Sequence, residues 1–291
     1  MKHQKRPPWL LLLPILVIYA LLIGGGLLAA FIESLGYIPV LGLTTFSLDS
    51  YRRLFMQQGF LNDFMFSLWI AFISSLLSTF LGVTIAYAVT TTRAKRLSSI
   101  TRKAMQTGLI LPYLYGIFLA VTMISQSGLL SRLFYHLGLI QEPRAFPELL
   151  YDRAGLGIVF VFVLKGTPFV ALFVSNIMSR VSADYRDVAK TLRARNLTVL
   201  RKIYLPLCST VIVWCASVLF AYDLGSFEVP YMLGALRPVA LSARLYSLYI
   251  SPDLLTIPQT MAMSVFLFLT GLICTAIYAI ALKKILGGRL T

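Results

Sequence analysis

Ionisable side chains inside apolar runs are the residues whose chemistry stands out in this sequence. Lys165 lies midway along the run Gly155 to Met178, and Asp223 and Glu228 flank the end of the run Pro206 to Tyr222. A charge at membrane depth is costly, so residues of this kind are candidates for function. Either Lys165 forms a structural ion pair with one of the two carboxylates, or the carboxylates face a pathway and attract a cationic solute. Simple placement at the membrane interface is the third interpretation.

The backbone around these carboxylates is also unusual. Gly225 and Pro230 predict a broken or re-entrant chain, which a membrane tolerates only where protein or water covers it. Tyr231 follows directly and is a further pathway candidate, although tyrosines at the ends of apolar runs more often belong to the interfacial belt. The candidate pathway residues are therefore Lys165, Asp223, Glu228 and Tyr231.

Signatures of catalysis and of metal binding are missing from the sequence. Lys165-Gly166-Thr167 resembles the end of a nucleotide-binding phosphate loop, but the upstream glycine is absent and the tripeptide sits in an apolar run. The three cysteines lie in apolar runs without a CxxC pair, and His3 and His136 are far apart. We therefore predict no catalytic residue, no metal site and no cofactor in this chain, and expect any driving energy to come from a partner or an ion gradient.

Composition excludes a soluble enzyme. The chain has 291 residues, of which 58% are hydrophobic and only 13% charged, and its mean hydropathy is +0.81. Soluble proteins carry about 25% charged residues. The net charge of +15 is spread in short clusters between apolar runs rather than in one basic domain, so nucleic acid is not the expected partner.

Six apolar stretches are long enough to cross a bilayer, which requires about 20 residues per helix. The predicted fold is an all-α membrane protein with six transmembrane helices. The third and fifth stretches are less regular than the others, because Pro112 interrupts one and the other runs into the acidic Gly- and Pro-containing segment. The six are Trp9 to Ile32, Phe64 to Val89, Met105 to Ile124, Gly155 to Met178, Pro206 to Tyr222 and Pro258 to Leu282.

The distribution of Lys and Arg predicts the orientation. The two termini and two of the connections hold eighteen of these residues, whereas the opposite connections hold seven. Because basic residues accumulate on the cytoplasmic side, both termini are expected there. We predict a single membrane domain, residues 1–291, with a cytoplasmic loop at 179–205 and outside segments at 33–63, 126–154 and 228–255.

The cytoplasmic loop before the fifth span carries the most specific pattern in the chain. It is expected to form a helix-turn-helix, in which Val188, Leu192 and Leu200 make an apolar stripe and Pro206 opens the next span. The loop resembles the signature E-A-A-x-x-x-G, nine residues, I-x-L-P of binding-protein-dependent ABC permeases. The residues that match its positions are Asp187, Val188, Ala189, Arg193, Ile203, Leu205 and Pro206.

Two positions depart from that signature. Asp187 stands where the family has glutamate, which keeps the charge on a shorter arm. Arg193 replaces a glycine, and because arginine does not readily adopt a positive φ, the turn there is expected to be displaced or made differently.

Two other segments support the same resemblance. Residues 46–55, Phe-Ser-Leu-Asp-Ser-Tyr-Arg-Arg-Leu-Phe, are similar to a segment that precedes the second span of such permeases. Residues 223–234, Asp-Leu-Gly-Ser-Phe-Glu-Val-Pro-Tyr-Met-Leu-Gly, are similar to a segment of the spermidine/putrescine branch.

The resemblance implies a type I ABC importer permease, which is not itself an ATPase, in the bacterial inner membrane. It implies that the loop 179–205 docks on ATP-binding subunits, two in number, which hold ATP and Mg²⁺. It further implies a second permease subunit, either the same chain or a sister chain, and a periplasmic or lipid-anchored solute-binding protein. A polyamine or another small cation is the first expectation for the solute.

Other interpretations remain open at this point. Related permeases carry iron(III), phosphonate or thiamine. An ion-coupled secondary transporter is the main rival and would need inverted repeats and an ion-coupling site. A membrane receptor or assembly scaffold would need no solute pathway.

Overall fold

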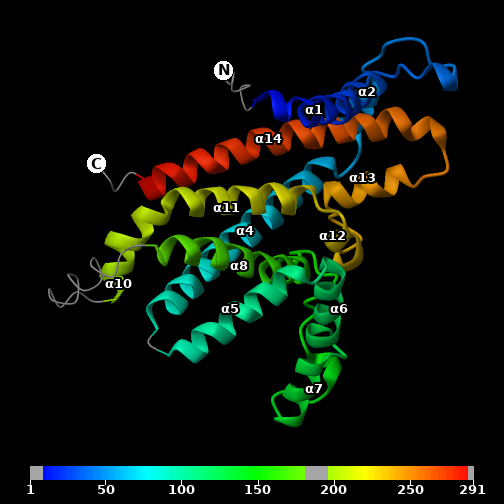
Figure 1. The fold of residues 1–291 in the computed structure, drawn as a ribbon. Helices are drawn as coiled ribbons and strands as arrows, with labels where there is room; N and C mark the ends of the chain where they lie inside the picture. The colour runs from blue at the N-terminus through cyan, green and yellow to red at the C-terminus, as the bar shows by residue number, and fades with distance from the viewer. Residues whose placement is uncertain (1–8, 93, 181–195, 288–291) are drawn as a thin grey trace, which may run out of the picture. The chain divides into compact units, whose positions relative to one another are not determined.

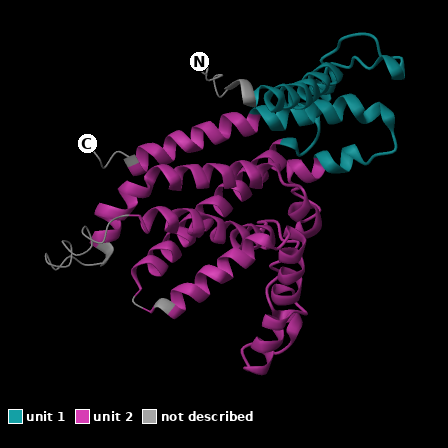
Figure 2. Cartoon of the chain, in the orientation of Figure 1, with its two compact units in different colours: residues 1–60, 245–269 teal, residues 61–244, 270–291 magenta. Residues whose placement is uncertain are grey.

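The computed structural model describes residues 9–92, 94–180 and 196–287. These residues are helical throughout, apart from turns, short loops and an isolated bridge between Ile38 and Leu43. They form two compact units, residues 1–60 with 245–269 and residues 61–244 with 270–291 (Figure 2). That the whole chain forms a single membrane domain stays a prediction.

The first unit contains the N-terminal apolar run and the short helix that follows it. A π-helical turn, Ala20–Gly24, joins α1 (Trp9–Tyr19) to α2 (Gly25–Ser34), so that the two make one long apolar helix. The hydroxyl groups of Ser34 and Tyr51 lie 2.8 Å apart and attach α3 (Asp49–Met56) to the end of α2. The ring of Phe266 packs edge-on against Phe55 and tilted against Phe60, with ring centroids 5.5 and 5.3 Å apart.

The second unit is organised around α8 (Leu156–Met178), the most buried of the long helices. Figure 1 shows α8 running beside α5 and α11, and its contacts extend to α6 and α12. The bounds of the other helices are α4 (Phe60–Thr91), α5 (Lys95–Ile110), α6 (Tyr113–Ile124), α7 (Leu129–His136), α10 (Asn196–Val199), α11 (Leu205–Gly225), α12 (Glu228–Leu233), α13 (Leu241–Tyr249) and α14 (Ile257–Gly287).

Glycines allow α4 and α8 to pack closely. A Cβ atom at Gly82 would lie 2.5 Å from Cβ of Val170, and one at Gly166 would lie 2.6 Å from Oγ of Ser78. Without a hydrophobic driving force between helices in lipid, such close approach supplies much of the attraction between them.

Six described helices are long and apolar enough to cross a membrane, which confirms the predicted fold class. They are Leu12–Ser34, Phe60–Thr91, Tyr113–His136, Leu156–Met178, Leu200–Gly225 and Leu254–Leu286. An even number of spans is consistent with both termini on the same side of the membrane. That this side is the cytoplasm stays a prediction.

The predicted third span, Met105 to Ile124, was wrong in its limits. Residues 105–110 belong to α5, and the third span begins at Tyr113 after a break in the chain. The ring of Pro112 keeps the preceding residue out of the helical region, and Leu111 accordingly has an extended ψ of 134°.

The close α4–α8 packing predicts that Gly82→Ala destabilises the protein. The added methyl overpacks the contact with Val170, which should lower the free energy of unfolding by about 1–3 kcal/mol and lower the melting temperature of the purified protein in detergent. Gly25→Ala is the matched control, because no atom lies within 4 Å of its added Cβ. Equal melting of the two variants would contradict the importance of this contact.

Candidate functional site

The end of α11 is where the candidate residues gather. α11 ends at Gly225, Ser226 is extended with ψ of 128°, and α12 begins at Glu228. Pro230 lies in the first turn of α12, where the missing N–H costs no helical hydrogen bond. The predicted break in the backbone is therefore confirmed, and the hydroxyl of Ser242 donates to the freed carbonyl of Ser226 at 2.8 Å.

Asp223 is almost completely enclosed at this break. Its side chain is 4% exposed, and the hydroxyl of Ser74 on α4 donates to its Oδ2 at 2.5 Å. The same hydroxyl oxygen lies 2.7 Å from the carbonyl of Ile70. Asp223 thus lies against α4 inside the unit, rather than on an open surface that solute would reach directly.

Lys165 has partners of a different kind from those predicted. Its ammonium donates to the carbonyl oxygens of Gly108 and Leu109, at 2.8 and 3.2 Å, and to that of Leu111. It also lies 5.3 Å from the ring centroid of Tyr113. The last carbonyls of a helix lack intrahelical partners and carry partial negative charge, so a cation there is favourable.

The predicted ion pair of Lys165 with Asp223 or Glu228 is therefore wrong. All three side chains are described, and neither carboxylate lies within ion-pair distance of the ammonium. The carbonyls at the end of α5 bind the ammonium instead. The break at Leu111 and Pro112 removes the N–H groups that would bond these carbonyls in a continuous helix, and Lys165 on the neighbouring α8 replaces them.

Glu228 differs from Asp223 because it faces an open cavity. This cavity, of about 310 Å³, is lined by Ala221, Tyr222, Gly225, Ser226, Phe227 and Glu228. Tyr222 stacks on Tyr113 with ring centroids 5.1 Å apart. Tyr231 is 49% exposed on α12 but does not line this cavity. The cavity thus combines the Glu228 carboxylate with the aromatic rings of Tyr222 and Phe227. Of these three residues, the sequence had indicated only Glu228.

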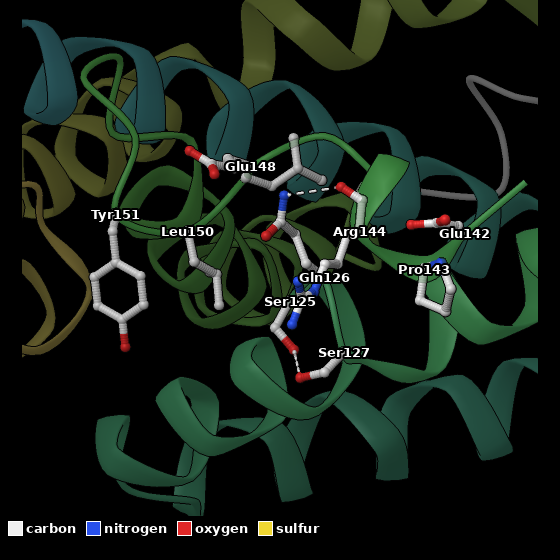
Figure 3. A pocket seen from close by; sticks show the side chains of 10 residues that line it. Ser125, Gln126, Ser127, Glu142, Pro143, Arg144, Glu148, Leu150 and Tyr151 are labelled. Carbon is white, nitrogen blue, oxygen red and sulfur yellow. Dashed lines mark hydrogen bonds between the residues drawn. The ribbon is translucent and has the colours of Figure 1, made fainter. Parts of the chain in front are cut away.

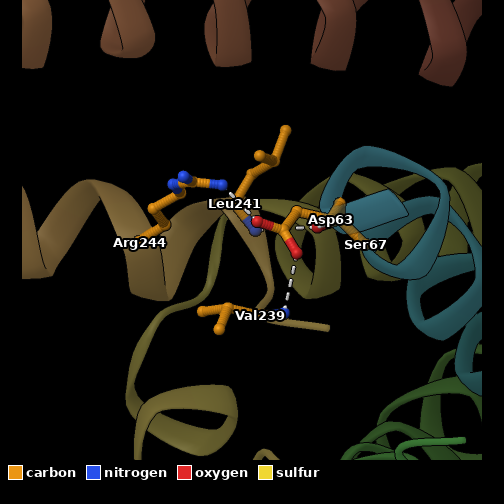
Figure 4. A network of polar contacts seen from close by, with 5 residues as sticks. All are labelled: Asp63, Ser67, Val239, Leu241 and Arg244. Atoms are coloured by element: carbon orange, nitrogen blue, oxygen red, sulfur yellow. Dashed lines mark hydrogen bonds and ion pairs between the residues drawn. The ribbon is translucent and has the colours of Figure 1, made fainter. Parts of the chain in front are cut away.

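A buried polar network fixes the segment between α12 and α13, and sequence reasoning missed it. Asp63 at the start of α4 pairs with Arg244 and accepts a hydrogen bond from the backbone N–H of Val239 at 2.9 Å (Figure 4). Ser67, one turn further along α4, accepts from the N–H of Leu241 at 2.8 Å. The only signal in the sequence was an acidic residue in the first turn of an apolar span.

The segment 126–154 forms a second cavity, of about 690 Å³, and is joined to α12. Gln126, which lines the cavity, donates to the carbonyls of Arg144 and Phe146, and Figure 3 shows the bond to Arg144. Tyr151 has a φ of +59°, and its N–H donates to the carbonyl of Leu233 at 3.1 Å. Strained backbone of this kind persists only where its surroundings hold it.

The predicted coupling residues are only partly described. Asp187, Val188, Ala189, Leu192 and Arg193 lie outside the described residues. Pro206 opens α11 as expected.

The other two coupling positions, Ile203 and Leu205, pack on the cluster of Val83, Val174 and Met178. Tyr204 between them is buried and meets Tyr87 with ring centroids 5.6 Å apart. The junction of the loop with the fifth span is therefore fixed to α4 and α8.

Metal-binding chemistry finds no support in the part of the chain that the structure describes. No group of three or more His, Cys, Asp or Glu side chains is close enough there to hold an ion. Cys208 and Cys215 are free and buried.

Comparisons with known proteins agree with one another. The family described as binding-protein-dependent transport system inner membrane component matches residues 79–286. Over 172 residues, which are 59% of this chain and 72% of the relative, the chain is 28% identical to the molybdenum transport system permease protein ModB of Azotobacter vinelandii.

Two solved structures share the fold. One is a bacterial ABC transporter involved in the import of the acidic polysaccharide alginate, with a TM-score of 0.78 and 15% identity over 95% of each chain. The other is a bacterial alginate ABC transporter in complex with an alginate pentasaccharide-bound periplasmic protein, with a TM-score of 0.77, 15% identity, and coverage of 93% of this chain and 91% of that one.

The contacts of Lys165 predict that Lys165→Met destabilises the protein, although methionine is well suited to lipid and to apolar packing. The variant leaves the carbonyls of Gly108, Leu109 and Leu111 unpaired, which should cost about 1–3 kcal/mol of unfolding free energy. Thermal unfolding in detergent measures this, with the exposed Lys202→Met as control. A Lys165→Met protein that melts as high as wild type would show that these bonds contribute nothing.

Proposed function

This chain belongs to the family of binding-protein-dependent transport system inner membrane components, and on that premise we propose that it passes a small cationic solute, first of all a polyamine, into the cytoplasm. As the permease component of an ABC importer it is a multi-pass protein of the bacterial inner membrane, and ATP is hydrolysed by another subunit. Family membership also sets aside the ion-coupled secondary transporter.

The proposed assembly contains two ATP-binding subunits, which hold ATP and Mg²⁺, a second permease subunit and a periplasmic or lipid-anchored solute-binding protein. Both termini and the loop 179–205 face the cytoplasm, where the loop docks on an ATP-binding subunit. The loop signature supports the docking. The alginate transporter solved with a periplasmic protein supports the external partner.

The observation that carries the cationic solute is the exposed Glu228 carboxylate in a cavity with Tyr222 and Phe227. A carboxylate beside aromatic faces suits an ammonium group, through charge and through cation–π attraction. Lys165 is not among the lining residues of this cavity, and its ammonium is bonded to the carbonyls of Gly108, Leu109 and Leu111.

An anionic solute is the second candidate. It is favoured by the structural neighbours, whose alginate is an acidic polysaccharide. In the described residues of this chain, however, no Lys or Arg lines the cavity at the α11–α12 junction. This cavity therefore gives an anionic solute no cationic side chain to bind.

Purification from native membranes tests the proposed coupling. We expect an ATPase with a phosphate loop to co-purify with the wild-type chain and to be lost from the variant Asp187→Arg with Ala189→Glu, because the reversed charges oppose docking. Asp184→Asn, which lies beside the signature but outside it, raises the net charge by the same one unit and is the charge-matched control that should retain the ATPase. An ATPase held equally by all three proteins would place the docking surface elsewhere.

Uptake into proteoliposomes tests the solute class, using the purified complex with its binding protein. For putrescine or spermidine, Glu228→Gln should raise the KM about tenfold, because a neutral acceptor replaces a charged one opposite the ammonium group. Glu148→Gln, at the other cavity, is the control and should transport as wild type. Uptake of an anion but of neither polyamine by the wild-type complex would overturn the cationic solute and leave the importer assignment intact.

A further inference from the structure

The short helix α3 carries exposed apolar and cationic side chains. It stands between the first span, which ends at Ser34, and the second, which begins at Phe60. The bond between the hydroxyl groups of Ser34 and Tyr51 keeps α3 at the end of the first span. Its Phe55 and Met56 side chains are exposed, 56% and 69%, beside charged residues. Exposed apolar and cationic side chains on one short helix suit the bilayer interface.

One face of α3 borders a cavity of about 560 Å³. Residues 49, 52, 53 and 56 follow the spacing that puts side chains on one side of a helix. Gln57 stands three residues before the second span, and Gln259 is near the start of the sixth. The cavity therefore opens at the level of lipid headgroups. Its lining is Asp49, Arg52, Arg53, Met56, Gln57 and Gln259.

The charged groups of this cavity form no ion pairs in the described chain. Neither arginine pairs with Asp49 or with another described carboxylate. The cavity thus offers two positive charges and one negative charge.

We propose that this cavity binds the headgroup of a zwitterionic aminophospholipid such as phosphatidylethanolamine. The phosphate lies against Arg52 and Arg53, since guanidinium groups bind phosphate oxygens through charge-assisted hydrogen bonds. The ammonium donates to the Asp49 carboxylate. The acyl chains continue into the bilayer past Met56. Free phosphate or an acidic side chain of another protein would satisfy the arginines but would leave the Asp49 carboxylate without a cationic partner.

Lipid retention measured by native mass spectrometry tests the phosphate contacts. Purified wild-type complex should keep phosphatidylethanolamine, and the double variant R52Q/R53Q should retain about tenfold less of it. The control R153Q/R237Q removes the same charge at exposed arginines that line none of the three cavities and should retain the lipid. Equal retention by both double variants would overturn the proposal.

Lipid exchange tests the ammonium contacts without any mutation. Phosphatidylcholine has the same phosphate but a methylated nitrogen that donates no hydrogen bond, so wild type should bind it about tenfold more weakly. Asp49→Asn should reduce that preference.

Three outcomes would overturn the assignment. The first is equal retention of the two lipids by wild type. The second is displacement of the bound lipid by millimolar inorganic phosphate. The third is an R52Q/R53Q complex that keeps its lipid but loses stimulation of ATP hydrolysis by the binding protein, which would assign the arginines to an acidic partner surface.

Discussion

A backbone that leaves the helix in a membrane protein must find its hydrogen bonds elsewhere in the protein wherever water is excluded, and three helix breaks in the described residues are bonded in this way. At the α5–α6 break, Lys165 donates to the carbonyls that α5 leaves free. After α11, Ser242 donates to the carbonyl of Ser226. Between α12 and α13, Asp63 and Ser67 accept from two backbone N–H groups. Lys165, Asp63 and Ser67 therefore lie where these breaks leave backbone groups without a helical partner.

This requirement separates structural charges from functional ones. Lys165 and Asp63 both lie in apolar helices, and each bonds groups that would otherwise lack a partner. Lys165 bonds main-chain carbonyls, and Asp63 bonds an arginine and a backbone N–H group. Glu228 bonds no unpaired backbone group in the described chain. Its carboxylate is exposed at a cavity, so the packing of the described residues does not explain an acidic side chain at that position. Intramembrane charge by itself therefore indicates function poorly, since local bonds account for Lys165 and Asp63.

Hydropathy predicted the six spans because a lipid environment imposes one requirement on about 20 successive residues, and that requirement is local. The partners of Lys165 were not predictable in this way. Its acceptors are main-chain carbonyls more than 50 residues away, and a carbonyl has no signature in the sequence. Even so, Pro112 stood inside the predicted third span, and the rule that helices end before a proline, applied strictly, places the break where the structure has it. The network of Asp63 and Arg244 was likewise out of reach, because 181 residues separate the pair.

The same arrangement explains how a short helix at a cavity can respond to the rest of its unit. α12 has only six residues, too few to be stable alone. Its end is bonded through Leu233 to the strained Tyr151, and the segment that follows it is held by α4 through Asp63 and Ser67. Its start carries Glu228 into the cavity, with Val229 and Leu233 buried in the same apolar cluster as Leu150. Since α12 has no independent stability, its position follows from these attachments, so a shift of either the segment 126–154 or the start of α4 must move Glu228. The exposed carboxylate of Glu228 is therefore coupled to both elements through these attachments.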